Sequence, residues 1–82
     1  MWCVYVLQCA DGTLYTGITK DLESRLRSHT QGTGAKYTRG RGPFTVLHQE
    51  CCASKGEALQ REHAIKALRR EDKLKLGSTA RA

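Results

Sequence analysis

The chain has 82 residues, of which 39% are hydrophobic, a size near the lower limit at which one apolar core stabilises a fold without disulfides or metals. A single domain is therefore expected, since several domains would not fit within these 82 residues. The formal net charge of +6 indicates an anionic partner such as nucleic acid or a lipid surface, although a solvated basic face would give the same excess.

No segment approaches the roughly 18 consecutive apolar residues of a membrane-spanning helix. No basic leader precedes the apolar start, so neither a membrane span nor a signal peptide is expected, and a cytoplasmic location is predicted. The cysteines have no C-x-x-C spacing and the histidines are not spaced for zinc. Free thiols that fill apolar space are therefore expected at Cys3, Cys9, Cys51 and Cys52.

The first elements have the pattern of a β-hairpin. "MWCVYVLQC" is rich in aromatic and β-branched residues, with apolar side chains on both faces as in a central strand. Asp11-Gly12 is a strong hairpin-turn signal, and "TLYTGI" returns as the second strand. Antiparallel pairing would allow Tyr5 and Tyr15 to lie on the same side of the sheet, but several registers are compatible with the sequence.

The segment "KDLESRLRSHT" predicts a helix with Asp21 as its N-cap. Leu22 and Leu26 lie four residues apart and form an apolar stripe. Arg25 and His29 are also four apart, so they form a second stripe beside the first, at the rim of the core.

The segment "TQGTGAKYTRGRGP" predicts a long, basic, glycine-rich loop, and long loops without regular structure are often functional. Its cations favour phosphate contacts by Lys36, Arg39 and Arg41, and Tyr37 would stack on a base. A loop that is basic only for solubility is the alternative. "FTVLHQE" follows as a third strand.

The segment "SKGEALQREHAIKALRRE" predicts a helix that begins with a capping box of Ser54 and Glu57. Glu62 falls inside its apolar face, where a carboxylate is costly unless it is paired or binds a metal. "EDKLKL" predicts a short closing helix, so the domain is expected to cover residues 1–76, with a disordered tail at 77–82. The apolar face comprises Ala58, Leu59, Ile65 and Leu68.

Together these motifs resemble the GIY-YIG nuclease superfamily, and more closely its small stand-alone bacterial members. The two family tripeptides stand here as "VYV" and "YTG", about ten residues apart. The Arg-x-x-x-His helix "KDLESRLRSH", the "TGAKYTRGRGPFTVL" segment and the glutamate helix "EALQREHAIK" follow in the family order, so the resemblance covers residues 3 to about 76. It implies an α/β (α+β) fold with a three-stranded antiparallel sheet flanked by helices.

The resemblance also implies roles for five residues. Tyr5 and Tyr15 would line the catalytic surface, Arg25 would contact the scissile phosphate, and His29 would lie beside it. Glu62 would hold one divalent cation, Mg²⁺ or Mn²⁺; with a single acidic ligand, water and phosphate oxygens would fill the other positions. Ordinary structural roles are the alternatives: strand aromatics, a solvated helix flank, and a Glu62 paired with a neighbouring Arg.

Gly17 of "YTG" would let the substrate approach the backbone closely. The chain departs from the family in two places: Val4 replaces the first glycine of the first tripeptide, and "EDKLKL" lacks the asparagine that several members carry after the metal-binding glutamate. Neither departure removes a charged catalytic group.

The general base is the demanding part of the proposed chemistry. A free phenol with a pKa of about 10 is only about 0.1% ionised at pH 7, a penalty of about 4 kcal/mol. Tyr15 is the preferred base if a neighbouring cation lowers its pKa, and Tyr5 would orient it or the attacking water. His29 is the competitor, because the ordinary pKa of histidine already suits the task.

The predicted function is metal-dependent hydrolysis of phosphodiester bonds in DNA, directed by structure or ends with low sequence specificity, in a process such as DNA repair; RNA is not excluded. Two alternatives stay open. The domain could be a non-catalytic nucleic-acid-binding module, or a nuclease subunit that is active only with a partner protein supplying specificity.

Overall fold

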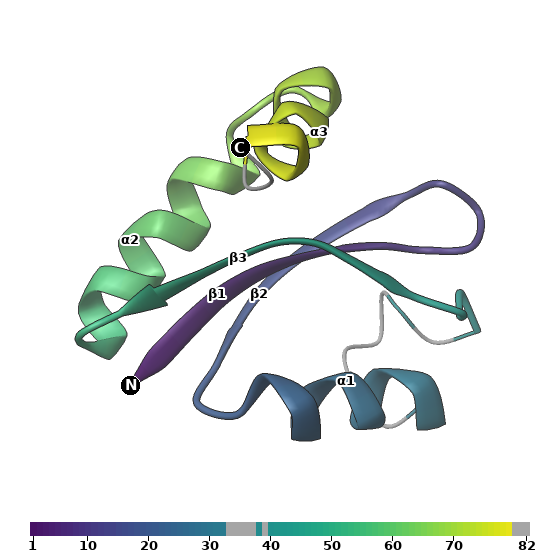
Figure 1. Cartoon of the computed structure of the whole chain (residues 1–82), viewed down its shortest axis with the longest axis horizontal. Helices are drawn as coiled ribbons and strands as arrows, with labels where there is room; N and C mark the ends of the chain where they lie inside the picture. The colour runs from purple at the N-terminus through teal and green to yellow at the C-terminus, as the bar shows by residue number, and fades with distance from the viewer. Residues whose placement is uncertain (33–37, 39, 80–82) are drawn as a thin grey trace.

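The computed structural model of the chain describes residues 1–32, 38 and 40–79. Three strands form one antiparallel sheet in the order β2-β1-β3, with α1 on one side and α2 and α3 on the other (Figure 1). This architecture confirms the predicted α/β (α+β) class with a three-stranded sheet flanked by helices. The elements are β1 (Trp2–Gln8), β2 (Leu14–Thr19), α1 (Leu22–Gln31), β3 (Thr45–Cys52), α2 (Lys55–Lys66) and α3 (Arg70–Thr79).

The β1–β2 hairpin turns at the predicted place. Gly12 has a φ of 86°, a left-handed conformation that glycine adopts at little cost. The Asp11 carboxylate accepts hydrogen bonds from the backbone N–H and the hydroxyl of Thr13, at 3.0 and 2.6 Å. In the resulting register Tyr5 pairs with Gly17 and Leu7 pairs with Tyr15, so both tyrosines lie on the same face of the sheet.

The central strand β1 is buried on both faces, as its apolar pattern predicts. Val4 and Val6 point to the α2 side and pack with Ala58 and Ile65, while Tyr5 points to the α1 side. β1 is the middle strand of the sheet, and its side chains point alternately to the two faces. Each face of this small sheet therefore has its own buried cluster.

Helix α1 begins at the expected N-cap but buries a different side chain. Asp21 accepts a hydrogen bond from the Ser24 N–H at the N-terminus, and Gly32 closes the C-terminus with a φ of 78°. The leucines of the predicted apolar stripe are only half-buried, and His29 is the buried residue of the helix. The leucines were expected to be buried and His29 to lie at the rim of the core, and the reverse is found. The reason is that the sheet face below α1 offers polar partners to an imidazole.

Helix α2 starts at the predicted capping box, with the Ser54 hydroxyl accepting from the Glu57 N–H at 3.2 Å. The two predicted helices, residues 54–71 and the short closing helix after them, are both present, but the break between them comes earlier. Helix α2 ends at Lys66, and α3 begins at Arg70 and continues to Thr79. Only part of the predicted apolar face is buried: Leu59 and Leu68 stay 45% and 37% exposed.

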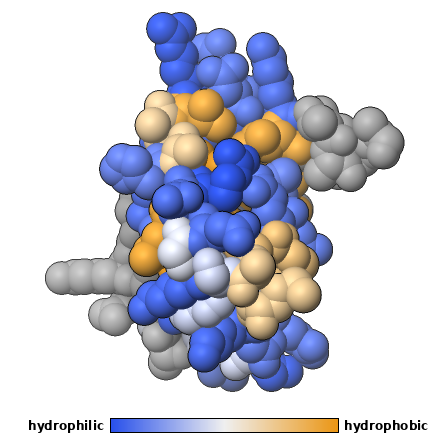
Figure 2. Space-filling view, turned by 90° about the vertical axis from the view of Figure 1, so that its left-hand side faces the viewer, coloured by the Kyte–Doolittle hydropathy of each residue, from blue (hydrophilic) through white to orange (hydrophobic). Residues whose placement is uncertain are grey.

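The surface is mostly hydrophilic, as expected for a chain with 39% hydrophobic residues. Figure 2 shows the face at the α2 end, where hydrophilic side chains dominate and apolar ones form separate patches. All four cysteines are free thiols; Cys9 and Cys52 fill apolar space as predicted, but Cys51 is exposed on β3, so the prediction was wrong for that residue. No helix within the described ranges is both long enough and apolar enough to cross a membrane.

Candidate active site

The side chain of Tyr5 lies against Gly17 on the α1 face of the sheet. A Cβ added at Gly17 would lie 2.8 Å from the Tyr5 hydroxyl oxygen and 3.0 Å from Cε2 of Tyr15. Real Cβ atoms do not come this close to other heavy atoms, so the glycine is needed for the two rings to occupy this face. The substrate approach predicted for Gly17 stays a prediction; packing of the tyrosines already accounts for the residue.

The hydroxyl of Tyr5 joins two residues of α1. It lies 2.9 Å from Nε2 of His29, and Nε of Arg25 donates to it over a longer 3.4 Å. Because a guanidinium can only donate, the hydroxyl oxygen is the acceptor for Arg25, and its own proton is available for Nε2 of His29. Tyr5 thus links two other predicted site residues, Arg25 and His29, through its hydroxyl.

His29 is the centre of this cluster. Its Nδ1 lies 2.7 Å from the hydroxyl oxygen of Thr38, and both side chains are 1% exposed. When Nδ1 carries the proton and donates to Thr38, Nε2 is the acceptor that the Tyr5 hydroxyl requires. The rings of Tyr15 and Phe44 meet the imidazole edge-to-face, with centroids 5.2 and 5.9 Å away.

Thr38 and Phe44 are site residues that the sequence reasoning missed. Thr38 stands in the glycine-rich segment, where its basic neighbours attracted attention, and Phe44 opens a strand that was read only as structure. The pattern "YTRG" carries no local sign that its threonine is buried. Only the pairing of the loop with α1 reveals it.

The buried setting fixes the protonation of the cluster. Burial raises the pKa of the Tyr5 phenol, and a hydrogen bond from Arg25 opposes this rise. Burial lowers the pKa of His29, and the positive charge of Arg25 lowers it further. The hydrogen bond to Tyr5 raises the pKa of Arg25. Near neutral pH the cluster therefore holds a phenol, a neutral imidazole and a guanidinium, and Tyr5 is poorly suited to act as a base.

Tyr15 lies where this cluster meets solvent. Its ring centroid is 6.2 Å from that of Tyr5, and the residue belongs to β2, an edge strand of the sheet. It is half-buried and borders a hollow of about 360 Å³. The hollow is lined by Leu14, Tyr15, Thr16, Lys66 and Lys73. A substrate in this hollow would therefore meet Tyr15 before any other member of the cluster.

Glu62 reaches the same neighbourhood from the other side of the sheet. It lies on α2, its side chain is 20% exposed, and its carboxylate is 3.7 Å from the ammonium of Lys66. The expected conflict of an acid in an apolar face is relieved by partial exposure and by a lysine, not by the arginine that had been considered. Lys66 lines the hollow beside Tyr15, so Glu62 contacts a residue of the hollow's lining.

A divalent cation suits this donor set only if it keeps most of its water. Among the described residues, no group of three or more His, Cys, Asp or Glu comes together to enclose a metal. A single carboxylate is a hard oxygen ligand, which is how Mg²⁺ is commonly held, with water and phosphate oxygens completing its shell. Glu62 therefore fits the predicted Mg²⁺ or Mn²⁺ as its one protein ligand.

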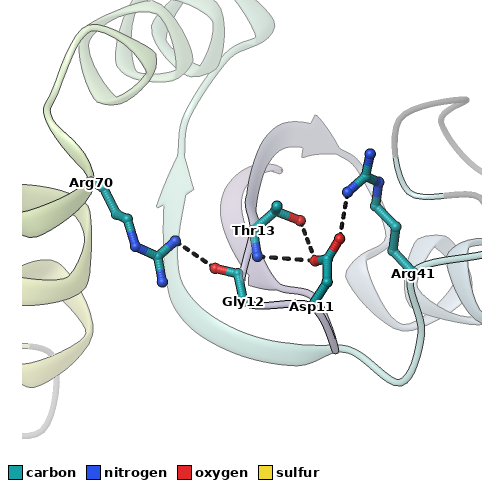
Figure 3. A network of polar contacts seen from close by, with 5 residues as sticks. All are labelled: Asp11, Gly12, Thr13, Arg41 and Arg70. Carbon is teal, nitrogen blue, oxygen red and sulfur yellow. Dashed lines mark hydrogen bonds and ion pairs between the residues drawn. The ribbon is translucent and has the colours of Figure 1, made fainter.

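Arg41 braces the hairpin from the side of the glycine-rich segment. Its guanidinium pairs with the Asp11 carboxylate (Figure 3). Its backbone carbonyl accepts from the Ala10 N–H at 2.8 Å. A phosphate contact by Arg41 stays a prediction, and the phosphate would compete with Asp11. The other predicted contacts of this segment, Lys36, Tyr37 and Arg39, lie outside the described residues.

Comparisons with known proteins agree with this architecture. Residues 1–75 match the family model of the GIY-YIG catalytic domain. UPF0213 protein OB0043 of Oceanobacillus iheyensis is 58% identical over 73 residues, which cover 89% of this chain and 85% of that protein. UPF0213 protein HQ_3675A of Haloquadratum walsbyi is 52% identical over 73 residues, 89% of this chain and 82% of its own.

Two solved structures are similar in sequence and fold. The solution NMR structure of UPF0213 protein BH0048 from Bacillus halodurans has 46% identity and a TM-score of 0.61, covering 96% of this chain and 85% of that one. The solution NMR structure of protein EF2693 from E. faecalis has 41% identity and a TM-score of 0.65, covering 96% and 84%. The names of these relatives state no activity.

Proposed function

The chain belongs to the GIY-YIG catalytic domain family, and on this premise we propose that it is a nuclease that hydrolyses phosphodiester bonds in DNA with the help of a divalent cation. The observation that supports the proposal best is the hydrogen-bonded series Arg25–Tyr5–His29, with Tyr15 packed on its imidazole at the rim of an open hollow. In this proposal Arg25 is the cation that binds the phosphate, and Tyr15, which packs on the same cluster, is the candidate base.

Arg25 is suited to bind the scissile phosphate. A guanidinium has five donors in a planar fork, more than Tyr5 and Tyr15 can accept, so donors remain for phosphate oxygens. Its hydrogen bond to Tyr5 limits the positions that it can adopt, which preorganises its charge for the transition state. Lysine would not reproduce this planar geometry.

Tyr15 is the proposed general base. It borders the hollow, whereas Tyr5 is fully buried and has a raised pKa. His29 holds its neutral imidazole against the Tyr15 ring, and its Nε2 is engaged with Tyr5, so its role is to fix both tyrosines. A cation on Glu62 would supply positive charge to the phosphate oxygens and the leaving group.

The described site has no element that could read bases over a whole recognition sequence, so binding would depend on the backbone and weaken with salt. We therefore expect nicked, flapped and branched DNA, the substrates met in DNA repair, to be preferred over any one sequence. A partner protein that presents such a substrate fits the same proposal.

The test is incubation of the pure protein with nicked, flapped, branched and single-stranded DNA, and with single-stranded RNA, in Mg²⁺, Mn²⁺ or EDTA. We expect cutting of at least one DNA structure that EDTA prevents. Folded protein that binds these nucleic acids but cuts none of them with either cation would replace the nuclease by a binding module.

A further inference from the structure

Two hollows adjoin along the open edge of the sheet. The hollow of about 360 Å³ beside Tyr15 is continued by a second hollow of about 220 Å³. Leu14 and Lys73 line both, so the two follow β2, which is an edge strand. The second hollow is lined by Thr13, Leu14, Arg70 and Lys73. Of its two basic residues, Lys73 also lines the hollow beside Tyr15, whereas Arg70 lines only the second hollow.

The lining of both hollows contains cations and no acid. Lys66 has its ammonium 3.7 Å from Glu62, outside hydrogen-bond distance, and its side chain is 55% exposed. Lys73 forms no ion pair within 4 Å in the part of the chain that the structure describes. Arg70 donates to a neutral carbonyl and keeps its charge. The three form a positive strip along β2.

Arg70 also fixes the position of Lys73. Its guanidinium donates to the carbonyl oxygen of Gly12 at the tip of the hairpin, opposite the side from which Arg41 approaches (Figure 3). Arg70 is the first residue of α3, and Lys73 follows on the same face of the helix three residues later. The start of α3 is thus fastened to the hairpin with Lys73 held over the strand.

Thr16 provides an independent sign of a ligand. It lines the larger hollow next to Tyr15 and is 4% exposed. Its buried hydroxyl oxygen has no hydrogen-bond partner among the described residues. Buried hydroxyls are nearly always hydrogen-bonded in native proteins, so an oxygen that enters the hollow would meet an unused polar group.

We propose that this strip, formed by Lys66, Arg70 and Lys73 with Thr16 at its inner end, binds the sugar–phosphate backbone of the nucleic-acid strand beside the bond that faces Tyr15. The proposal rests on the proposed function for the position of that bond. The larger hollow is at the low end of the range of about 300–1,000 Å³ found for small-ligand sites, which suits one nucleotide of a strand. The strip therefore guides a single strand from the active site towards α3.

The test compares two double variants that each remove one lysine from α2 and one from α3. K66A/K73A removes two of the three cations of the strip. K55A/K75A is the matched control, because Lys55 lies over the ring of Trp2 and Lys75 pairs with Asp72, and neither lines either of these two hollows. The readout is the affinity for a fluorescent ten-nucleotide single strand in EDTA at a series of salt concentrations.

We expect K66A/K73A to lower the slope of log affinity against log salt by about 1.4, since each phosphate contact on a single strand contributes about 0.7. The control should change it by less than half as much. Equal losses in the two variants would overturn the proposal. So would inorganic phosphate competing as well as the strand at equal phosphate concentration, because the site would then be one for small anions.

T16V sharpens the test, since valine keeps the shape of threonine and removes the hydroxyl. We expect about threefold weaker binding of the strand with an unchanged salt slope. Unchanged affinity would remove Thr16 from the site.

Cutting of flapped DNA, measured in parallel, separates this proposal from the proposed function. A wild-type protein that cuts nothing while K66A/K73A alone loses binding would support the strip and end the nuclease proposal. A K66A/K73A protein that binds and cuts like the control would support the nuclease proposal and end the proposal of the strip.

Discussion

The two faces of the sheet are packed by different interactions. On the side of α2 and α3, Val4 and Val6 meet Ala58 and Ile65 in an ordinary hydrocarbon core. On the side of α1, the buried groups are polar and hydrogen-bonded, with a histidine between a tyrosine and a threonine. Apolar contacts have little directional preference, whereas hydrogen bonds fix orientation. The first face can therefore stabilise the fold while the second holds reactive groups in place.

The two faces meet at the edge strand β2. Tyr15 comes to this edge from the polar face, and Lys66 comes to it from the apolar face together with its partner Glu62. This separation of the two faces has one exception, because Glu62, the proposed ligand of the cation, comes from the apolar side. The predictions below test that separation and its exception.

The largest effect is expected for Glu62→Ala. Cutting should fall by ~10³-fold or more, because the variant loses the one protein ligand proposed for the cation, while DNA affinity should stay within a fewfold. Single-turnover cleavage of flapped DNA and binding in EDTA measure the two quantities. Glu23→Ala is the control, since Glu23 forms the corresponding i,i+4 pair with Arg27 on α1 and is 84% exposed. Cutting by Glu62→Ala at the wild-type rate would show that the metal assignment is wrong.

Arg25→Ala is expected to slow cutting by about 10²- to 10³-fold, or about 3–4 kcal/mol, because it removes charge and hydrogen bonds at the phosphate. Arg27→Ala, two residues along the same helix, should cut nearly as fast as the wild type, since Arg27 is 65% exposed and pairs with Glu23. The measurement is again single-turnover cleavage at saturating protein. A loss below fivefold for Arg25→Ala would remove it from the transition state.

Ile65→Ala tests the apolar face. We expect a loss of about 3 kcal/mol in the free energy of unfolding, measured by urea denaturation, because the substitution leaves a cavity beside Val4 and Val6. The folded fraction should cut at the wild-type rate. Leu68→Ala, at a site that is 37% exposed, should cost less stability. A slower rate after correction for the folded fraction would mean that the two faces are not separable.

Local signals in the sequence were sufficient for the strands and helices, whereas the residues of the candidate site came from the family resemblance. Asp11-Gly12 specified the turn, Asp21 and Ser54 specified helix starts, and the alternation of β1 specified a strand with two buried faces. These features depend on neighbours within a few residues, which the sequence displays directly. The break between α2 and α3 was predicted too late in the chain, because "KALRRE" contains no Gly or Pro to signal where α2 ends.

The depth of individual side chains could not be predicted. A 3.6-residue period placed Leu26 inside and His29 at the rim, but the face below α1 carries hydroxyls, so the imidazole is buried and the leucine is not. The same reasoning could not predict that Thr38 holds His29, because His29 lies on a helix nine residues earlier in the chain. The register of the hairpin, which positions the face below that helix, was also open. Long-range pairing decided these cases.

The last prediction compares the two faces by acid titration. The folded-state pKa of His29 is depressed, so the unfolded chain binds more protons below about pH 6.5, and the free energy of unfolding should fall as the pH drops through this range. On the other side of the sheet, two hydrogen bonds from Arg61 lower the pKa of Glu50 to about 2, so its contribution is present above the ordinary pKa of 4.5 and disappears only as the pH falls towards 2.

Urea denaturation from pH 8 to pH 3 should therefore show two separate losses of stability. His29→Gln should flatten the upper one and Glu50→Gln the lower one. An upper loss that persists in His29→Gln would show that another group titrates there, and the neutral imidazole between Tyr5 and Thr38 would no longer explain how the polar face is held.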